Sequence, residues 1–106
     1  MKIIKAEELK KKIDSGEDFV LIDVLSKESF EVQHIPKSIS IPVGELEERA
    51  SKELPEKNKE IIVYCASKTC QASPAAAKKL EELGYKNVTD FEDGLAGWKE
   101  AGYEFE

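Results

Sequence analysis

Hydrophobic positions along the chain fall into short runs that alternate with segments of helical spacing. Two continuous apolar runs, 19–24 and 61–64, have the pattern of strands buried on both faces, as parallel sheets require. A third strand is expected at 39–41, where apolar and polar residues alternate and Pro42 closes the run as at a sheet edge, and a fourth at 87–91. Because helical patterns separate these strands, we expect an α/β layer fold on a mostly parallel sheet.

Residues typical of helix ends mark the segments between the strands. One helix is predicted between Ser73, which suits an N-cap, and Gly84, which suits the position after a helix end; Pro74 suits the first helical position. Ser26 is expected to cap a short helix at 28–32. Apolar spacing predicts three further helices, at 6–13, 45–51 and 94–101.

The length and the charge of the chain exclude several classes of protein. The 106 residues suit one unit, so residues 1–106 are predicted to form a single domain. No apolar run approaches the about 18 residues that cross a bilayer, so the chain is expected to be soluble, with no membrane partner. The 16 basic and 22 acidic residues are interleaved and sum to a net charge of −6, which argues against a nucleic-acid partner. Charged residues begin too early for a signal peptide, so we expect a cytoplasmic protein whose two cysteines are thiols.

Cys65 follows a buried strand and precedes a loop that ends at a helix N-terminus. Backbone N–H groups in such a loop can form an anion-binding nest, and the following helix adds positive potential. This environment is expected to lower the pKa of the Cys65 thiol and favour the nucleophilic thiolate, and Lys68 adds a cation. The alternative is that Cys65 is a small buried hydrophobe that completes the strand.

A series of motifs between residues 3 and 103 has the order and spacing of one known family. The motifs are Leu21-Ile22-Asp23-Val24, Glu28-Ser29-Phe30, His34-Ile35-Pro36, Ile41-Pro42, Val63-Tyr64-Cys65, Ala76-Ala77, Gly84-Tyr85, Asn87-Val88 and Asp93-Gly94-Leu95-Ala96-Gly97-Trp98. They resemble those of single-domain rhodaneses. The resemblance implies a five-stranded, mostly parallel sheet with helices on both faces, a three-layer sandwich. It also implies a sulfurtransferase that carries a sulfane sulfur as a persulfide on Cys65 and passes it to a thiophilic acceptor.

The active-site loop implied by the resemblance departs from the family pattern. Many rhodaneses have C-x-x-G-x-R, whereas this chain has Lys68 at the glycine position and Cys70 at the arginine position. Without a bidentate Arg, a thiosulfate dianion is expected to bind weakly. A small-molecule or protein persulfide or polysulfide is therefore the expected donor, and a thioredoxin-like or glutathione-like thiol the expected acceptor. The loop residues expected to bind anions are Ala66, Ser67, Lys68, Thr69, Cys70 and Gln71.

Cys70 is not supplied by the family pattern. One interpretation is a chance substitution in a tolerant loop. The other is a resolving thiol that forms a disulfide with Cys65 or shares its sulfane sulfur, since a curled loop can bring two Cα atoms within the about 4.4–6.8 Å that a disulfide needs.

The remaining chemical groups are assigned structural roles. His34, the single histidine, is expected to order its loop through a turn hydrogen bond rather than act as a general base, and Asp23 to anchor a neighbouring loop. Trp98 is expected in the core. No metal-ligand spacing or glycine-rich phosphate loop is present, so neither a metal nor a cofactor is expected.

Two other functions remain open on this sequence. A rhodanese-like module without turnover, acting in redox sensing or protein interaction, is consistent with the missing Arg but not with the retained Cys65. A phosphatase or arsenate reductase is disfavoured, because their loops end in an anion-clamping Arg and none lies between Cys65 and Gly84.

Overall fold

A computed structural model describes all 106 residues. Five strands form one sheet in the order β1-β5-β4-β2-β3, and every pairing is parallel. The strands are β1 (Lys2–Ile3), β2 (Val20–Asp23), β3 (Ser38–Ser40), β4 (Ile61–Tyr64) and β5 (Val88–Phe91). The helices are α1 (Ala6–Asp14), α2 (Lys27–Val32), α3 (Leu46–Glu53), α4 (Ala72–Glu82) and α5 (Gly94–Glu100), with a 3₁₀ turn, η1, at Val43–Glu45.

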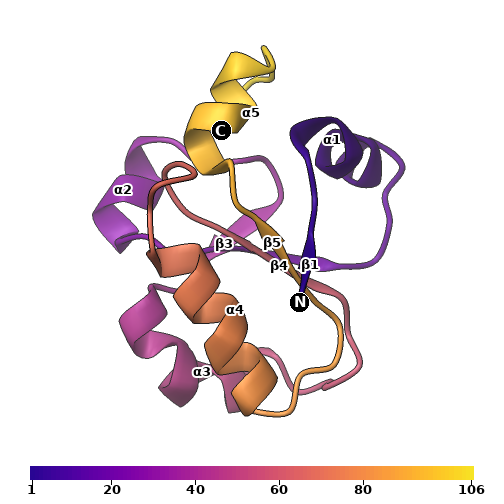
Figure 1. Cartoon of the computed structure of the whole chain (residues 1–106), viewed down its shortest axis with the longest axis vertical. Coiled ribbons are helices and arrows are strands. Elements are labelled where there is room, and N and C mark those ends of the chain that lie inside the picture. The colour runs from indigo at the N-terminus through magenta and orange to yellow at the C-terminus, as the bar shows by residue number, and fades with distance from the viewer.

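Helices cover both faces of the sheet, which confirms the predicted three-layer α/β architecture. Figure 1 shows α3 and α4 on one side of the strands and α1 and α5 on the other. The first side buries Leu46 of α3 and Leu80 of α4 in one hydrophobic cluster with sheet residues such as Val63. On the second side, Leu9 of α1 and Trp98 of α5 are buried in another cluster, which confirms the core assignment of Trp98.

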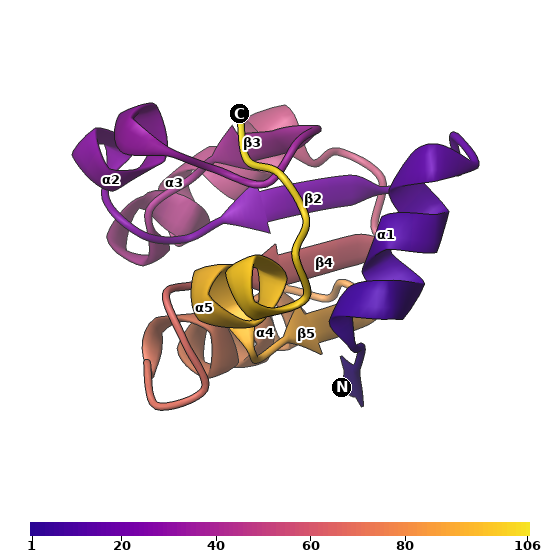
Figure 2. The same ribbon diagram turned by 90° about the horizontal axis from the view of Figure 1, so that it is seen from above.

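The central strands end together at one edge of the sheet, and Figure 2 shows β2 and β4 side by side and running in the same direction toward it. Strand β4 lies between β2 and β5, and its last residue, Tyr64, pairs in register with Asp23 on one side and Phe91 on the other. Both neighbours are themselves the last residues of their strands. The loop that begins at Cys65 therefore leaves the middle of the carboxyl edge, where ligands of open parallel sheets bind.

The start of α4 differs from the sequence prediction. The N-cap is Gln71, which makes no side-chain capping bond, so Ser73 is the second helical residue and Pro74 the third. The assignments of Ser73 as N-cap and Pro74 as first residue are therefore wrong. Proline is tolerated here because residues of the first turn need no backbone donor. The end of α4 is confirmed: Gly84 has φ +97°, its N–H donates to Glu81 O at 3.1 Å, and the next N–H donates to Leu80 O at 3.0 Å.

The other elements lie close to their predicted positions. Ser26 caps α2, and its Oγ accepts from Ser29 N at 3.2 Å. The strand expected at 39–41 is found at Ser38–Ser40, on an edge of the sheet as predicted. The longest helix, α4, has 11 residues, and none of the helices has the length and apolar content to cross a membrane.

Candidate functional site

Cys65 is fixed at the end of the most deeply buried strand. All four residues of β4 are buried, and Cys65 itself is 0% exposed. Its carbonyl oxygen accepts from Leu95 N at 2.9 Å, and Ala66 O accepts from Ala96 N at 2.9 Å. The start of the loop is thus hydrogen-bonded to the first turn of α5, where helix N–H groups have no partner within the helix.

This contact depends on Gly94, a residue to which the sequence analysis assigned no role. Gly94 has φ +60°, and a Cβ added to it would lie 2.2 Å from Cys65 O and 2.9 Å from Cys65 C. Only glycine combines this left-handed backbone with so close an approach. A glycine between a strand and a helix can indicate that another backbone segment approaches it closely, and this was the available sequence signal.

The sulfur of Cys65 lies against the N-terminal turn of α4. Ser73 N donates to Cys65 Sγ at 3.3 Å, and Sγ in turn donates to Cys70 O at 3.7 Å. The amide of Ser73 is one of the free donors of the helix start, and the sulfur occupies it in place of a capping side chain. The predicted nest therefore supplies at least one helix amide to the sulfur.

The rest of the loop curls back over this sulfur. Cys70 N donates to Ser67 O at 3.0 Å, which closes a turn, and Ser67 Oγ lies 3.1 Å from Thr69 Oγ1. Lys68 is exposed and takes part in no ion pair. Cys70 is half-buried and packs against the hydrophobic cluster that contains Cys65. Ala66 and Gln71 are exposed.

The two thiols titrate as a pair. Burial raises the pKa of Cys65, and its hydrogen bond to the Cys70 sulfur raises it further, against the opposing effect of Ser73. Burial also acts to raise the pKa of Cys70, but hydrogen bonds from Cys65 and from the amides of Ala66, Ala72 and Ser73 outweigh it, and the pKa is lowered. The expectation of a lowered pKa at Cys65 is therefore wrong for the free dithiol: the first proton leaves Cys70.

A second pair of buried polar residues, Ser73 and Asp90, lies on the face of the sheet that Cys65 shares. Ser73 and Asp90 are 0% and 1% exposed, and Ser73 Oγ and Asp90 Oδ1 have no hydrogen-bond partner. Burial raises the pKa of Asp90, and the nearby Ser73 hydroxyl opposes this shift. Asp90 was assigned no role from the sequence, although its position inside the strand expected at 87–91 indicated that its carboxyl is buried. No cluster of three or more His, Cys, Asp and Glu side chains suits a metal ion.

Asp23 is the last residue of β2 and His34 follows α2, and neither is hydrogen-bonded to Cys65. Asp23 is fully buried, its Oδ1 accepts from Leu25 N at 2.9 Å, and burial raises its pKa. His34 Nδ1 donates to Phe30 O at 2.7 Å, and the two rings stack at 3.8 Å between centroids. Both arrangements suit loop ordering, the role expected for these residues.

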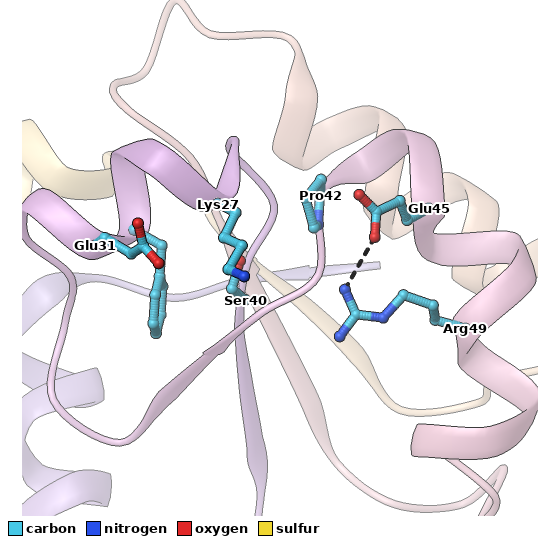
Figure 3. Close-up of a pocket in the computed structure, with 7 residues that line it drawn as sticks. Lys27, Glu31, Ser40, Pro42, Glu45 and Arg49 are labelled. Carbon is cyan, nitrogen blue, oxygen red and sulfur yellow. Dashed lines mark hydrogen bonds and ion pairs between the residues drawn. The ribbon is translucent and has the colours of Figure 1, made fainter.

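A pocket of about 390 Å³ opens beyond the end of β3, two strands away from Cys65 (Figure 3). Lys27 from α2 and Arg49 from α3 line it, and Arg49 is paired with Glu45 at 3.1 Å. No residue of the 65–71 loop lines this pocket.

Comparison with known proteins identifies the family. Residues 5–101 match the model of the rhodanese-like domain. The chain belongs to the rhodanese family. The crystal structure of the BH2092 protein from Bacillus halodurans has the same fold, with a TM-score of 0.91 and 32% identity over 99% of this chain and 76% of that one.

Two curated relatives of this chain bear sulfur-transfer names. The chain is 39% identical to YrkF of Bacillus subtilis, whose name describes a candidate sulfur carrier, over 90% of this chain. It is 32% identical to the thiosulfate sulfurtransferase GlpE of Coxiella burnetii, over 91% of this chain and 82% of that protein. The chain spans only 49% of the length of YrkF, so the activity of the whole relative does not transfer with the match.

Proposed function

We propose that this rhodanese-like domain is a sulfurtransferase that carries sulfane sulfur as a persulfide on Cys65. The observation that carries the proposal is the 3.3 Å hydrogen bond from Ser73 N to Cys65 Sγ, at the end of the central strand. A helix amide aimed at this sulfur stabilises a thiolate or a persulfide anion more than a neutral thiol. The sulfur-transfer names of the relatives support the same reaction class.

The reaction needs only thiol–persulfide exchange. The Cys65 thiolate attacks the sulfane sulfur of a donor R–S–SH, which forms the Cys65 persulfide and releases R–S⁻. Burial raises the pKa of Cys65, so the proton that it loses on attack is taken up by the released R–S⁻, which leaves as R–SH. An acceptor thiolate then attacks the outer sulfur, takes it as a new persulfide and restores Cys65.

The donor expected for this loop is a persulfide or polysulfide rather than thiosulfate. Lys68 is the one cation among residues 66–71. As an exposed point charge, it lacks the bidentate hydrogen bonding by which an Arg binds a dianion. Cys70 is half-buried and supplies no cation at the position where that Arg is expected. The acceptor is a thioredoxin-like or glutathione-like thiol. Because GlpE is named a thiosulfate sulfurtransferase, thiosulfate must be compared directly with persulfide and polysulfide as a donor.

Mass spectrometry tests both the persulfide on Cys65 and the donor preference. The purified protein is incubated with thiosulfate, polysulfide or cysteine persulfide, and a gain of about 32 Da, one sulfur atom, is sought. Trypsin cuts after Lys68 and so separates Cys65 from Cys70. We expect the added sulfur on the Cys65 peptide, fastest with polysulfide, and no such adduct on Cys65→Ser. Thiosulfate as the best donor would refute the donor preference. A folded protein that no donor modifies would instead support the module without turnover.

A further inference from the structure

Carrying sulfur on Cys65 leaves one chemically reactive residue of the loop without a role. This residue is Cys70. Its carbonyl oxygen lies 3.7 Å from Cys65 Sγ, and its side chain packs against the cluster that contains Cys65. The turn closed by Cys70 N and Ser67 O folds the chain back, so two cysteines five residues apart lie in contact. Neither forms a disulfide in this structure.

The two sulfurs also share the backbone amide of Ser73 as a donor. Ser73 N donates to Cys65 Sγ, and the amides of Ala66, Ala72 and Ser73 stabilise the Cys70 thiolate. Cys65 is fully buried whereas Cys70 is half-buried, so a thiol from solution meets Cys70 before it reaches Cys65. A thiolate held in the same loop has an effective concentration in about the millimolar range or above, which favours it over a dilute external thiol.

We propose that Cys70 is a resolving thiol for the Cys65 persulfide, an inference that rests on the proposed function. The Cys70 thiolate attacks Cys65 Sγ, the new Cys65–Cys70 bond replaces the bond to the outer sulfur, and hydrosulfide leaves. The sulfane sulfur is reduced to sulfide while the two cysteines are oxidised to a disulfide, so no outside oxidant is needed. A dithiol reductant then restores both thiols and becomes a disulfide itself. The domain thereby releases sulfide from a persulfide at the expense of a dithiol.

The experiment follows the fate of the loaded sulfur. Wild type, Cys70→Ser, Cys70→Ala and Cys65→Ser are loaded with polysulfide, desalted and trapped with an alkylating agent at successive times. Intact mass, free sulfide and tryptic peptides are then measured. In wild type we expect loss of about 2 Da, a cross-link between the peptides on either side of Lys68, reversal by dithiothreitol, and release of sulfide. In both Cys70 variants we expect the persulfide to persist about tenfold longer or more.

The outcomes separate the inference from the function on which it rests. Persulfides of equal lifetime in wild type and Cys70→Ser, with no cross-linked peptide, would overturn the resolving role and leave the sulfurtransferase intact. Neither persulfide in the Cys70 variants nor disulfide in wild type would overturn the sulfurtransferase itself. A disulfide that also forms without polysulfide, in air at the same rate, would overturn the persulfide-driven step.

Discussion

Gly94 offers a direct test of how the Cys65 loop is held. Replacement by alanine adds one methyl group 2.2 Å from Cys65 O, where ordinary contact begins at 3.4 Å. The loop or α5 must therefore move by about 1 Å. Such a shift acts on the hydrogen bonds from Leu95 N to Cys65 O and from Ala96 N to Ala66 O, each 2.9 Å long.

The size of the effect follows from two independent costs. Alanine in the left-handed region costs about 1–2 kcal/mol, and an added methyl group in a closed space costs about 1–3 kcal/mol. The free energy of unfolding should therefore fall by roughly 2–5 kcal/mol. Domains of this size have about 5–15 kcal/mol of stability, so the Gly94→Ala variant should remain folded while its loop is displaced.

Gly102→Ala is the matched control for the backbone cost. Gly102 has φ +86°, but an added Cβ meets no atom within 4 Å. Urea unfolding should show a loss of about 1–2 kcal/mol in this control and unchanged loading of Cys65 with sulfur. Gly94→Ala should lose more stability and load Cys65 at least about tenfold more slowly, since a displaced loop no longer aims the helix amide at Sγ. Equal stability and equal loading in the two variants would refute the claimed close approach.

Three further substitutions test the buried polar groups and the loop cation. Burial raises the folded-state pKa of Asp90, so the wild-type protein loses stability as pH rises through that pKa. The stability of Asp90→Asn relative to wild type should therefore be greater at pH 7 than at pH 4, as measured by urea unfolding at both pH values. Tyr64→Phe removes the hydroxyl that accepts from the buried Ile35 N at 3.1 Å and should lower the free energy of unfolding by about 1–3 kcal/mol. Lys68→Ala should slow sulfur loading from anionic donors, measured by mass, and leave unfolding unchanged.

Two of these variants have a counterpart on the same chain, and the third is checked by its pH dependence. Tyr103→Phe removes a hydroxyl that makes no hydrogen bond, so a loss as large as that of Tyr64→Phe would contradict the role given to Tyr64. Lys78→Ala removes another exposed lysine without an ion pair, and an equal slowing of sulfur loading would reduce the role of Lys68 to net charge alone. A stability difference between Asp90→Asn and wild type that does not change with pH would contradict a raised pKa at Asp90.

Local signals predicted much of the fold because they depend on nearby residues. The continuous apolar runs located β2 and β4, and Gly84 marked the end of α4 because a left-handed residue is needed there. The two residues of β1 carry too little pattern to indicate a strand; the strand exists because it pairs with β5, which is distant in sequence.

The site was predicted in place but not in detail. The strand–loop–helix pattern located Cys65 correctly at the carboxyl edge, yet the direction of its pKa shift depends on burial and on the contact with Cys70, which only the folded loop defines. Ser73 was assigned as a cap from its residue type, whereas a sulfur rather than a side-chain oxygen occupies the free amide. Asp90 lies near Ser73 because β5 pairs with β4 and packs against α4, a long-range arrangement that no local pattern encodes.

The hydrogen bonds from α5 to the Cys65 loop also set an order of events during synthesis. Domains emerge from the ribosome with their N-terminal part first. Both cysteines and all of α4 are therefore made before Leu95 and Ala96, whose amides hold Cys65 O and Ala66 O. Until those residues arrive, the thiols lack their final enclosure and are open to solvent oxidants. Maturation of this site is thus completed only when α5 docks, after α4 has been made.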